Sequence, residues 1–144
     1  MRMRHVPQIR LAVPLLCLSL AFLGGCKGAP QLPQQQTAGL NIDVLKARNV
    51  KRGVEVSAKI WNTHNDTLTF KLGDVRLKCG DGVEVSPNAT RQQPAVPSKN
   101  FTVFNWIFPV DKPLPGGKYE IEIQELAVDG VDINMAAQFQ IVLK

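Results

Sequence analysis

The sequence predicts an all-β protein, built as an antiparallel two-sheet sandwich of about seven to nine short strands. Two observations support this prediction. From Leu40 onward, apolar and polar residues alternate with a period of two, which is typical of half-buried strands. Clusters of Gly, Pro, Asn and Asp interrupt this alternation at short intervals, as in sandwich domains. The 105 residues of 40–144 are enough for one independently folding domain.

The first four expected strands each show apolar residues at every second position. Their shared-face residues are Leu40, Ile42 and Val44; Val54, Val56, Ala58 and Ile60; Leu68, Phe70 and Leu72; and Val75, Leu77 and Cys79. Residues 62–66 (Asn-Thr-His-Asn-Asp) form a turn by composition. Residues 80–82 (Gly-Asp-Gly) predict a tight hairpin turn, and Val83 and Val85 begin the return strand.

Residues 86–100 contain three prolines and predict a long loop, and the stretch that follows is apolar on both faces. One face carries Phe101, Val103 and Ile107, and the other carries Phe104, Trp106 and Phe108. This pattern fits a central strand covered on both sides, or a strand whose aromatic face is partly exposed. In the second case Phe104, Trp106 and Phe108 form a contact surface, because exposed aromatic patches mark interfaces.

The last two expected strands form a hairpin around Asp129-Gly130. The first contains Tyr119, Ile121 and Ile123, and its continuation at Leu126 and Val128 is out of phase, which predicts a bulge near Gln124. The second alternates regularly, with one face made of Val131, Ile133, Met135, Ala137, Phe139, Ile141 and Leu143.

The N-terminal residues have the order of a secretory signal. Three arginines and no acidic residue precede an apolar run over 11–23, which is too short and too interrupted by proline to span a bilayer permanently. Leu23-Gly24-Gly25-Cys26 resembles the lipobox of bacterial lipoproteins, although Ala or Ser is commoner than Gly at position 24. The expected organisation is a signal peptide (1–25), a flexible Gln/Pro-rich tether (26–39) and the sandwich domain (40–144).

The lipobox resemblance implies cleavage between Gly25 and Cys26, a diacylglycerol on the Cys26 sulfur and acylation of the new amine. Two or three acyl chains would anchor the protein stably in a membrane. Lys27, rather than Asp, follows the cysteine, and by the enterobacterial rule this favours the outer membrane, facing the periplasm. The alternatives are an ordinary secretory signal, with Cys26 merely nearby, or a stretch that is retained whole as an anchor.

Composition excludes some classes of function. Loss of the three signal-peptide arginines leaves 14 basic against 12 acidic residues, a net charge of +2, so a nucleic-acid partner has no support. After cleavage and lipidation Cys79 is the remaining cysteine, so no intramolecular disulfide is expected. We expect no cofactor.

The domain resembles the immunoglobulin-like domains of bacterial envelope lipoproteins and, more distantly, the water-stress (late embryogenesis abundant type 2) domain. The shared features are Trp61-Asn62 before a polar turn, Leu68-Thr-Phe70, Val75-Arg-Leu77, Asp81-Gly82 and Pro115-Gly-Gly-Lys-Tyr119. The Cys…Trp…Cys set of antibody domains is missing. The resemblance implies no active site, and a fold alone does not define a function.

Few residues are candidates for chemistry. His64 could join only a mixed metal site with Asn62, Asp66 or Asp74, so we expect no metal. Cys79 alternates onto an apolar face, which favours an inert thiol over a reactive one. The cations at the first turn, Lys46, Arg48, Lys51 and Arg52, could contact anionic headgroups or form a solvated hairpin tip. Glu120, Glu122 and Glu125 are expected on a solvated strand face.

These observations favour a non-enzymatic envelope lipoprotein that is anchored through Cys26 and acts through contacts with an envelope protein. The alternative is a binding module for glycan, peptidoglycan or an ion, which would use the turn 62–66 and the loop 86–100. An enzyme is not expected, because no nucleophile or carboxylate pair lies in a known catalytic motif.

Overall fold

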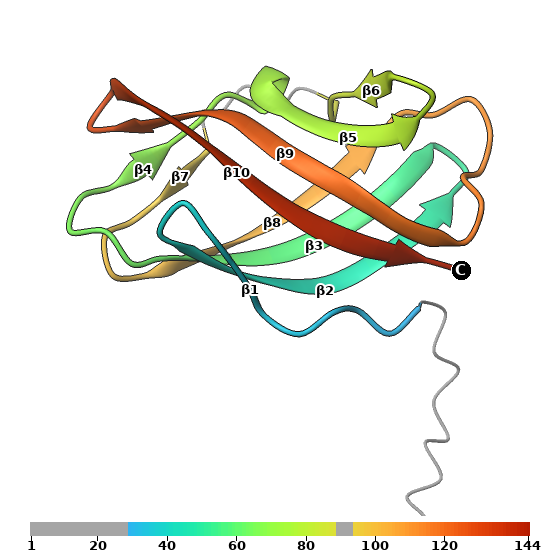
Figure 1. Cartoon of the computed structure of the whole chain (residues 1–144), viewed down its shortest axis with the longest axis horizontal. Coiled ribbons are helices and arrows are strands. Elements are labelled where there is room, and N and C mark those ends of the chain that lie inside the picture. Colours follow the sequence, from blue (N-terminus) through green and yellow to red (C-terminus); the bar gives the residue numbers. More distant parts are fainter. Residues whose placement is uncertain (1–28, 89–93) are drawn as a thin grey trace, which may run out of the picture.

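The computed structural model describes residues 29–88 and 94–144, and it confirms an all-β domain of two antiparallel sheets (Figure 1). Sheet A has four strands, in the order β1 (Gln35–Thr37), β2 (Leu40–Val50), β3 (Gly53–Asn62) and β8 (Phe101–Phe108). Sheet B has six strands: β4 (Leu68–Thr69), β5 (Val75–Gly80), β6 (Val83–Val85), β7 (Ala95–Val96), β9 (Gly117–Val128) and β10 (Val131–Leu143). The strands that the sequence did not predict are β1 and β7, which have three and two residues.

The core lies between the sheets and is made by the alternating residues that the sequence marked as apolar. The inward residues of β2 and β3 are buried, as are Val75 and Leu77 of β5 and Ile121 and Ile123 of β9. Burying one such side chain contributes roughly 1.5–3 kcal/mol. The alternation therefore predicted the inner faces of these four strands correctly.

The third expected strand is mostly not a strand. Leu68, Phe70 and Leu72 are all buried, but strand pairing stops at Thr69, and a short 3-10 helix follows over Leu72–Asp74. The prediction that every second side chain from Leu68 to Leu72 is buried was correct. The prediction of one continuous strand was wrong, because the chain turns after Thr69 to enter β5.

The predicted bulge in β9 is confirmed. Ile123 pairs with Ala137 and Leu126 pairs with Met135, so two residues of β9 lie opposite the single residue Ala136. This shift returns Leu126 to the core, where it is 1% exposed.

The uniform apolar face expected for β10 extends over only half of the strand. Its last four members, from Ala137 to Leu143, are buried, but Val131 is 68% exposed and Met135 is 37% exposed. A second irregularity separates Asp132 from Met135, where Asn134 has a positive φ of 53°. The start of β10 lies in the projecting β9–β10 hairpin, where Ile133 is partly buried against the core but Val131 and Met135 are exposed.

Gly53 allows β3 and β8 to approach closely. Its φ is +140°, and a Cβ built at this position would lie 2.0 Å from the carbonyl oxygen of Phe108. Glycine is the residue that this backbone conformation and this contact require.

Of the expected flexible tether (26–39), residues 31–37 are instead bonded to the domain. Gln31 donates from Nε2 to the Val142 carbonyl and accepts from the Val142 amide, both at 2.9 Å. Gln35 makes the same pair of bonds to Gln140, at 2.8 and 2.7 Å, and Thr37 Oγ1 accepts from the Gln138 amide. We name Gln31, Gln35 and Thr37 the glutamine clamp. It attaches the N-terminal segment along the open edge of β10, which composition alone could not reveal.

Candidate functional site

The outer face of sheet A carries exposed apolar side chains on two neighbouring strands. Trp61 of β3 and Phe101 of β8 are paired in register and are 37% and 43% exposed, and Val103 follows on β8 at 44%. The two rings stack with centroids 5.8 Å apart and planes inclined by 23°. We call Trp61, Phe101 and Val103 the aromatic strip.

A cation lies within the aromatic strip. Lys59 pairs in register with Val103, and its Nζ is 4.3 Å from the centroid of the Phe101 ring. A cation at this distance from an aromatic face is attracted by the ring quadrupole, by roughly 0.5–1 kcal/mol at an exposed site. The strip thus combines apolar area with one positive charge.

The contact surface expected at Phe104, Trp106 and Phe108 lies on the inner face of β8, so this expectation is corrected. Trp106 is 4% exposed and Phe108 is fully buried, whereas Phe104 is partly buried. Trp106 packs against Phe139 of β10 with ring centroids 6.4 Å apart, which joins the two sheets. The strand was identified correctly, but its opposite face is the exposed one. The sequence already placed Phe101 and Val103 together on one apolar face of this strand. That Trp61 lies beside Phe101 could be seen only from the pairing of β3 with β8 in the structure.

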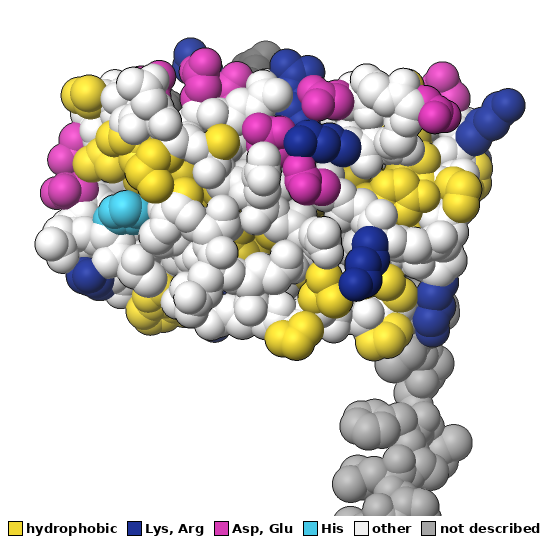
Figure 2. Space-filling model, in the orientation of Figure 1, with side chains coloured by type: hydrophobic (Ala, Val, Ile, Leu, Met, Phe, Trp, Pro, Cys, Tyr) yellow, Lys and Arg dark blue, Asp and Glu magenta, His cyan; other side chains and the backbone are white. Residues whose placement is uncertain are grey.

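The four cations of the first turn divide into two pairs. Lys46 and Arg48 donate to the Glu55 carboxylate at 2.9 and 2.6 Å, and these bonds lower the pKa of Glu55 below its ordinary value of 4.5. Lys51 and Arg52 form the exposed tip between β2 and β3. Figure 2 shows Lys and Arg side chains in dark blue at the end of the molecule where the N-terminal segment leaves.

Of the three expected surface glutamates, two form an ion-pair cluster on the outer face of sheet B. Lys78 of β5 contacts Glu120 at 2.6 Å and Glu122 at 2.9 Å, and these two bonds raise the pKa of Lys78. Glu125 lies in the β9 bulge and is exposed. Lys78 and Glu120 are paired in register across β5 and β9, so the ion pairs join these two strands.

The turn 62–66 is organised around the buried side chain of Asn62. Its Nδ2 donates to the carbonyl oxygens of Asp66 at 2.8 Å and Val96 at 3.1 Å, and its Oδ1 accepts from the His64 amide at 2.8 Å. The His64 ring contacts the Ala38 carbonyl at 2.9 Å. Residues 29–88 and 94–144 contain no group of three His, Cys, Asp or Glu side chains that could hold a metal ion. The turn is thus held by hydrogen bonds within it and to the neighbouring residues Ala38 and Val96.

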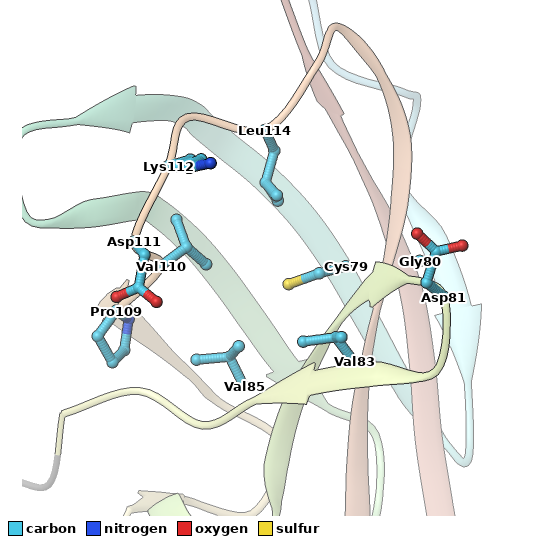
Figure 3. Close-up of a pocket in the computed structure, with 10 residues that line it drawn as sticks. All are labelled: Cys79, Gly80, Asp81, Val83, Val85, Pro109, Val110, Asp111, Lys112 and Leu114. Carbon is cyan, nitrogen blue, oxygen red and sulfur yellow. The ribbon is translucent and has the colours of Figure 1, made fainter.

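Cys79 lines a cavity of about 390 Å³ at the opposite end of the domain from this turn (Figure 3). The cavity lies between the β5–β6 hairpin and the segment that leads from β8 to β9. Its apolar lining consists of Cys79, Val83, Val85, Pro109, Val110 and Leu114, with Asp81, Asp111 and Lys112 beside them. Burial raises the pKa of the Cys79 thiol above its ordinary value of 9.0, which keeps the sulfur protonated and weakly nucleophilic at neutral pH.

The predicted lipidation and cleavage residues, Gly25 and Cys26, lie outside the described residues. Within the described part of the chain, no helix is both long enough and apolar enough to cross a membrane.

Neither a protein-family model nor a curated protein matches this sequence significantly. Two solved structures from Bacillus subtilis share the fold. One is the ycdA protein, named as a candidate lipoprotein, with a TM-score of 0.54 and 18% identity over 76% of this chain. The other is the yjhA protein, with a TM-score of 0.54 and 10% identity over 78% of this chain.

The two solved chains are matched over different shares of their own length. The match covers 96% of the yjhA chain but only 38% of the ycdA chain. At such identities the likeness is one of fold alone. The chain is therefore an all-β domain whose architecture also occurs in a candidate bacterial lipoprotein.

Proposed function

We propose that this chain is a lipid-anchored protein of the bacterial cell envelope whose immunoglobulin-like domain binds another envelope protein and catalyses no reaction. The anchor is a diacylglyceryl group on Cys26, after cleavage at Gly25, in the outer membrane facing the periplasm. The lipobox pattern supports this anchor, and so does the fold that the domain has in common with a candidate lipoprotein. Intact mass of the protein purified from membranes tests it: an unmodified Cys26 or a retained signal peptide would refute the anchor.

The observation that carries the binding role is the aromatic strip. Exposed Trp and Phe side chains are enriched at the centres of protein interfaces, since they bury large apolar areas at a low cost in side-chain entropy. The strip also lies next to a strand edge, because β8 is the last strand of sheet A. A partner segment could therefore contact the strip. Further along β8 the edge is partly bonded already, since the Asn88 amide donates to the Ile107 carbonyl at 3.1 Å.

Photo-crosslinking in cells tests this surface. A photoreactive phenylalanine at position 101 is expected to give one adduct with an envelope protein, identified by mass spectrometry, and Trp61→Ala should abolish that adduct. The same group at Met135, which is also exposed and apolar, is the matched control and should give none. No adduct at 101, the same adduct at 135, or an adduct of two copies of this chain would each contradict a separate partner at the strip.

A second candidate function is ligand binding at one end of the sandwich, favoured by the cavity beside Cys79. Its apolar lining suits a small apolar molecule better than the glycan, peptidoglycan or ion first considered. A medium-chain fatty acid such as decanoate should then raise the melting temperature with its concentration, and the cavity-filling variant Val85→Phe should lose this response. An unchanged melting temperature in the original chain would reject this function.

A further inference from the structure

The glutamine clamp fixes which end of the domain lies near the proposed lipid anchor. Gln31 is bonded to Val142, near the end of β10, and lies five positions after Cys26. Five residues span at most about 18 Å when fully extended. A lipid on Cys26 would therefore hold this end of the domain close to the bilayer (Figure 1).

Four exposed cations gather at this end. Lys118 and Lys144 lie at the adjoining ends of β9 and β10, where Gly117 pairs with Leu143. Lys51 and Arg52 form the tip of the hairpin that begins with β2, and β2 contacts both β10 and the clamp strand β1. We name Lys51, Arg52, Lys118 and Lys144 the basic corner. None of the four forms an ion pair with another residue among 29–88 and 94–144.

Few negative charges offset the basic corner. Asp111, in the segment between β8 and β9, is followed directly by Lys112. Asp81 and Glu84 belong to the β5–β6 hairpin. In sheet B, β6 is two strands from β9, which carries Lys118, and three strands from β10, which corresponds to roughly 10 and 14 Å. Both separations exceed the Debye length of about 8 Å at physiological ionic strength.

The far end of the domain has the opposite charge. Its turns carry Asp66, Asp129 and Asp132 against Lys71 and Lys99. Figure 2 shows Asp and Glu side chains in magenta at this end and also along the upper edge of the molecule, as far as the upper right. The two ends thus differ in charge, and the more positive end is the one on the side of the clamp.

We propose that the basic corner docks on the anionic headgroups of the bilayer that holds the lipid anchor, so that the strands stand away from the membrane with the turn 62–66 outermost. This inference rests on the anchor proposed above. Each Lys or Arg near an anionic surface contributes about 1 kcal/mol, which is a factor of about five in affinity. The clamp makes docking specific to this end, because it removes the slack that a flexible tether would give.

Amine footprinting of the lipidated protein on vesicles tests the orientation. On vesicles containing phosphatidylglycerol, an impermeant acetylating reagent should label Lys51, Lys118 and Lys144 about fivefold more slowly than on phosphatidylcholine alone. Lys71 and Lys99, near the far end, should label equally on both. Equal labelling of the corner on the two vesicles, or equal protection of Lys71 and Lys99, would overturn the proposal.

A second experiment separates the basic corner from the anchor. All the contacts described here lie within residues 29–144, so the unlipidated chain 26–144 with Cys26→Ser keeps the whole core. It should bind phosphatidylglycerol vesicles at low salt. Lys51→Gln with Arg52→Gln should weaken that binding by up to roughly 30-fold, the factor for two charges. The matched pair Lys71→Gln with Lys99→Gln should not.

The two outcomes are independent. Equal losses in both double variants would reject the basic corner whatever the state of Cys26, whereas an unmodified Cys26 would reject the anchor alone.

Discussion

Trp106 and Phe139 face each other across the space between the two sheets, with ring centroids 6.4 Å apart. Trp106 belongs to β8 of sheet A and Phe139 to β10 of sheet B, so this contact is part of what holds the sheets together. It also explains why the aromatic residues of β8 do not all form a surface.

Trp106→Ala should therefore lower the free energy of unfolding by about 3–5 kcal/mol, through lost burial and the cavity left behind. Trp61→Ala, on the outer face, is the matched control, and we expect it to cost less than about 1 kcal/mol. Urea denaturation of both variants measures the difference. Equal losses would contradict the inner and outer faces assigned to β3 and β8.

Gln35→Leu should release one contact of the glutamine clamp. It removes both bonds to the main chain of Gln140, and at this exposed edge we expect a loss of about 1 kcal/mol and faster hydrogen exchange at the Gln140 amide. Gln36→Leu, at the exposed neighbouring position of β1, should change neither. Unchanged exchange at Gln140 in the Gln35 variant would argue that the clamp does not form.

Gly53→Ala should destabilise the domain by more than about 2 kcal/mol. The new Cβ would combine a strained φ with a collision against the carbonyl oxygen of Phe108. Gly73→Ala is the control, since no atom lies within 4 Å of the Cβ added there. Thermal denaturation compares the two variants, and a Gly53 variant as stable as the Gly73 variant would refute the close approach.

Glu55 should give the domain a small, acid-sensitive contribution to stability. Its hydrogen bonds with Lys46 and Arg48 lower its pKa in the folded state below 4.5. The stabilisation is therefore present above pH 4.5 and is lost as the pH falls through the lowered value. Both cations are more than a third exposed, so we expect less than about 1 kcal/mol.

Urea denaturation of the original chain and of Glu55→Gln at pH 7 and pH 3 measures this contribution. The two proteins should differ at pH 7 and converge at pH 3. If the difference in unfolding free energy between the two proteins grew towards pH 3, this would contradict a lowered pKa of Glu55.

Cys79 should react slowly with iodoacetamide at pH 7.5, and its rate should rise steeply only above pH 9. Burial raises the pKa of this thiol and so reduces the fraction of thiolate, the reactive form. Alkylation of the same chain in concentrated urea gives the unperturbed rate. A folded rate at pH 7.5 equal to that in urea would exclude a shielded thiol.

The alternation of apolar residues predicted the inner faces of most strands, because a strand with one buried face must alternate. It also located the β9 bulge, since Leu126 is apolar but out of phase with Ile123. It could not choose a face for β8, where both sets of alternate residues are apolar. It also overextended the buried face of β10, because Val131 and Met135 keep the phase but are exposed in the projecting β9–β10 hairpin.

The candidate surfaces were harder to predict than the fold. The aromatic strip depends on the register that pairs Trp61 with Phe101, two residues 40 positions apart. The clamp depends on side chains bonded to main-chain atoms more than 100 residues away. The composition of a segment does not indicate contacts with residues so distant in the sequence. For this reason the segment rich in Gln and Pro was predicted to be a flexible tether.

The clamp has a consequence for crowding. With the anchor proposed above, copies of the chain would diffuse in two dimensions and meet repeatedly with their domains similarly oriented, so a bare outer strand of thirteen residues would be a template for aggregation. An added strand would only have moved this hazard outward, since it would have an open edge of its own. Side-chain amides end the hydrogen-bonding ladder without extending it, and neighbouring molecules can pass without joining their sheets.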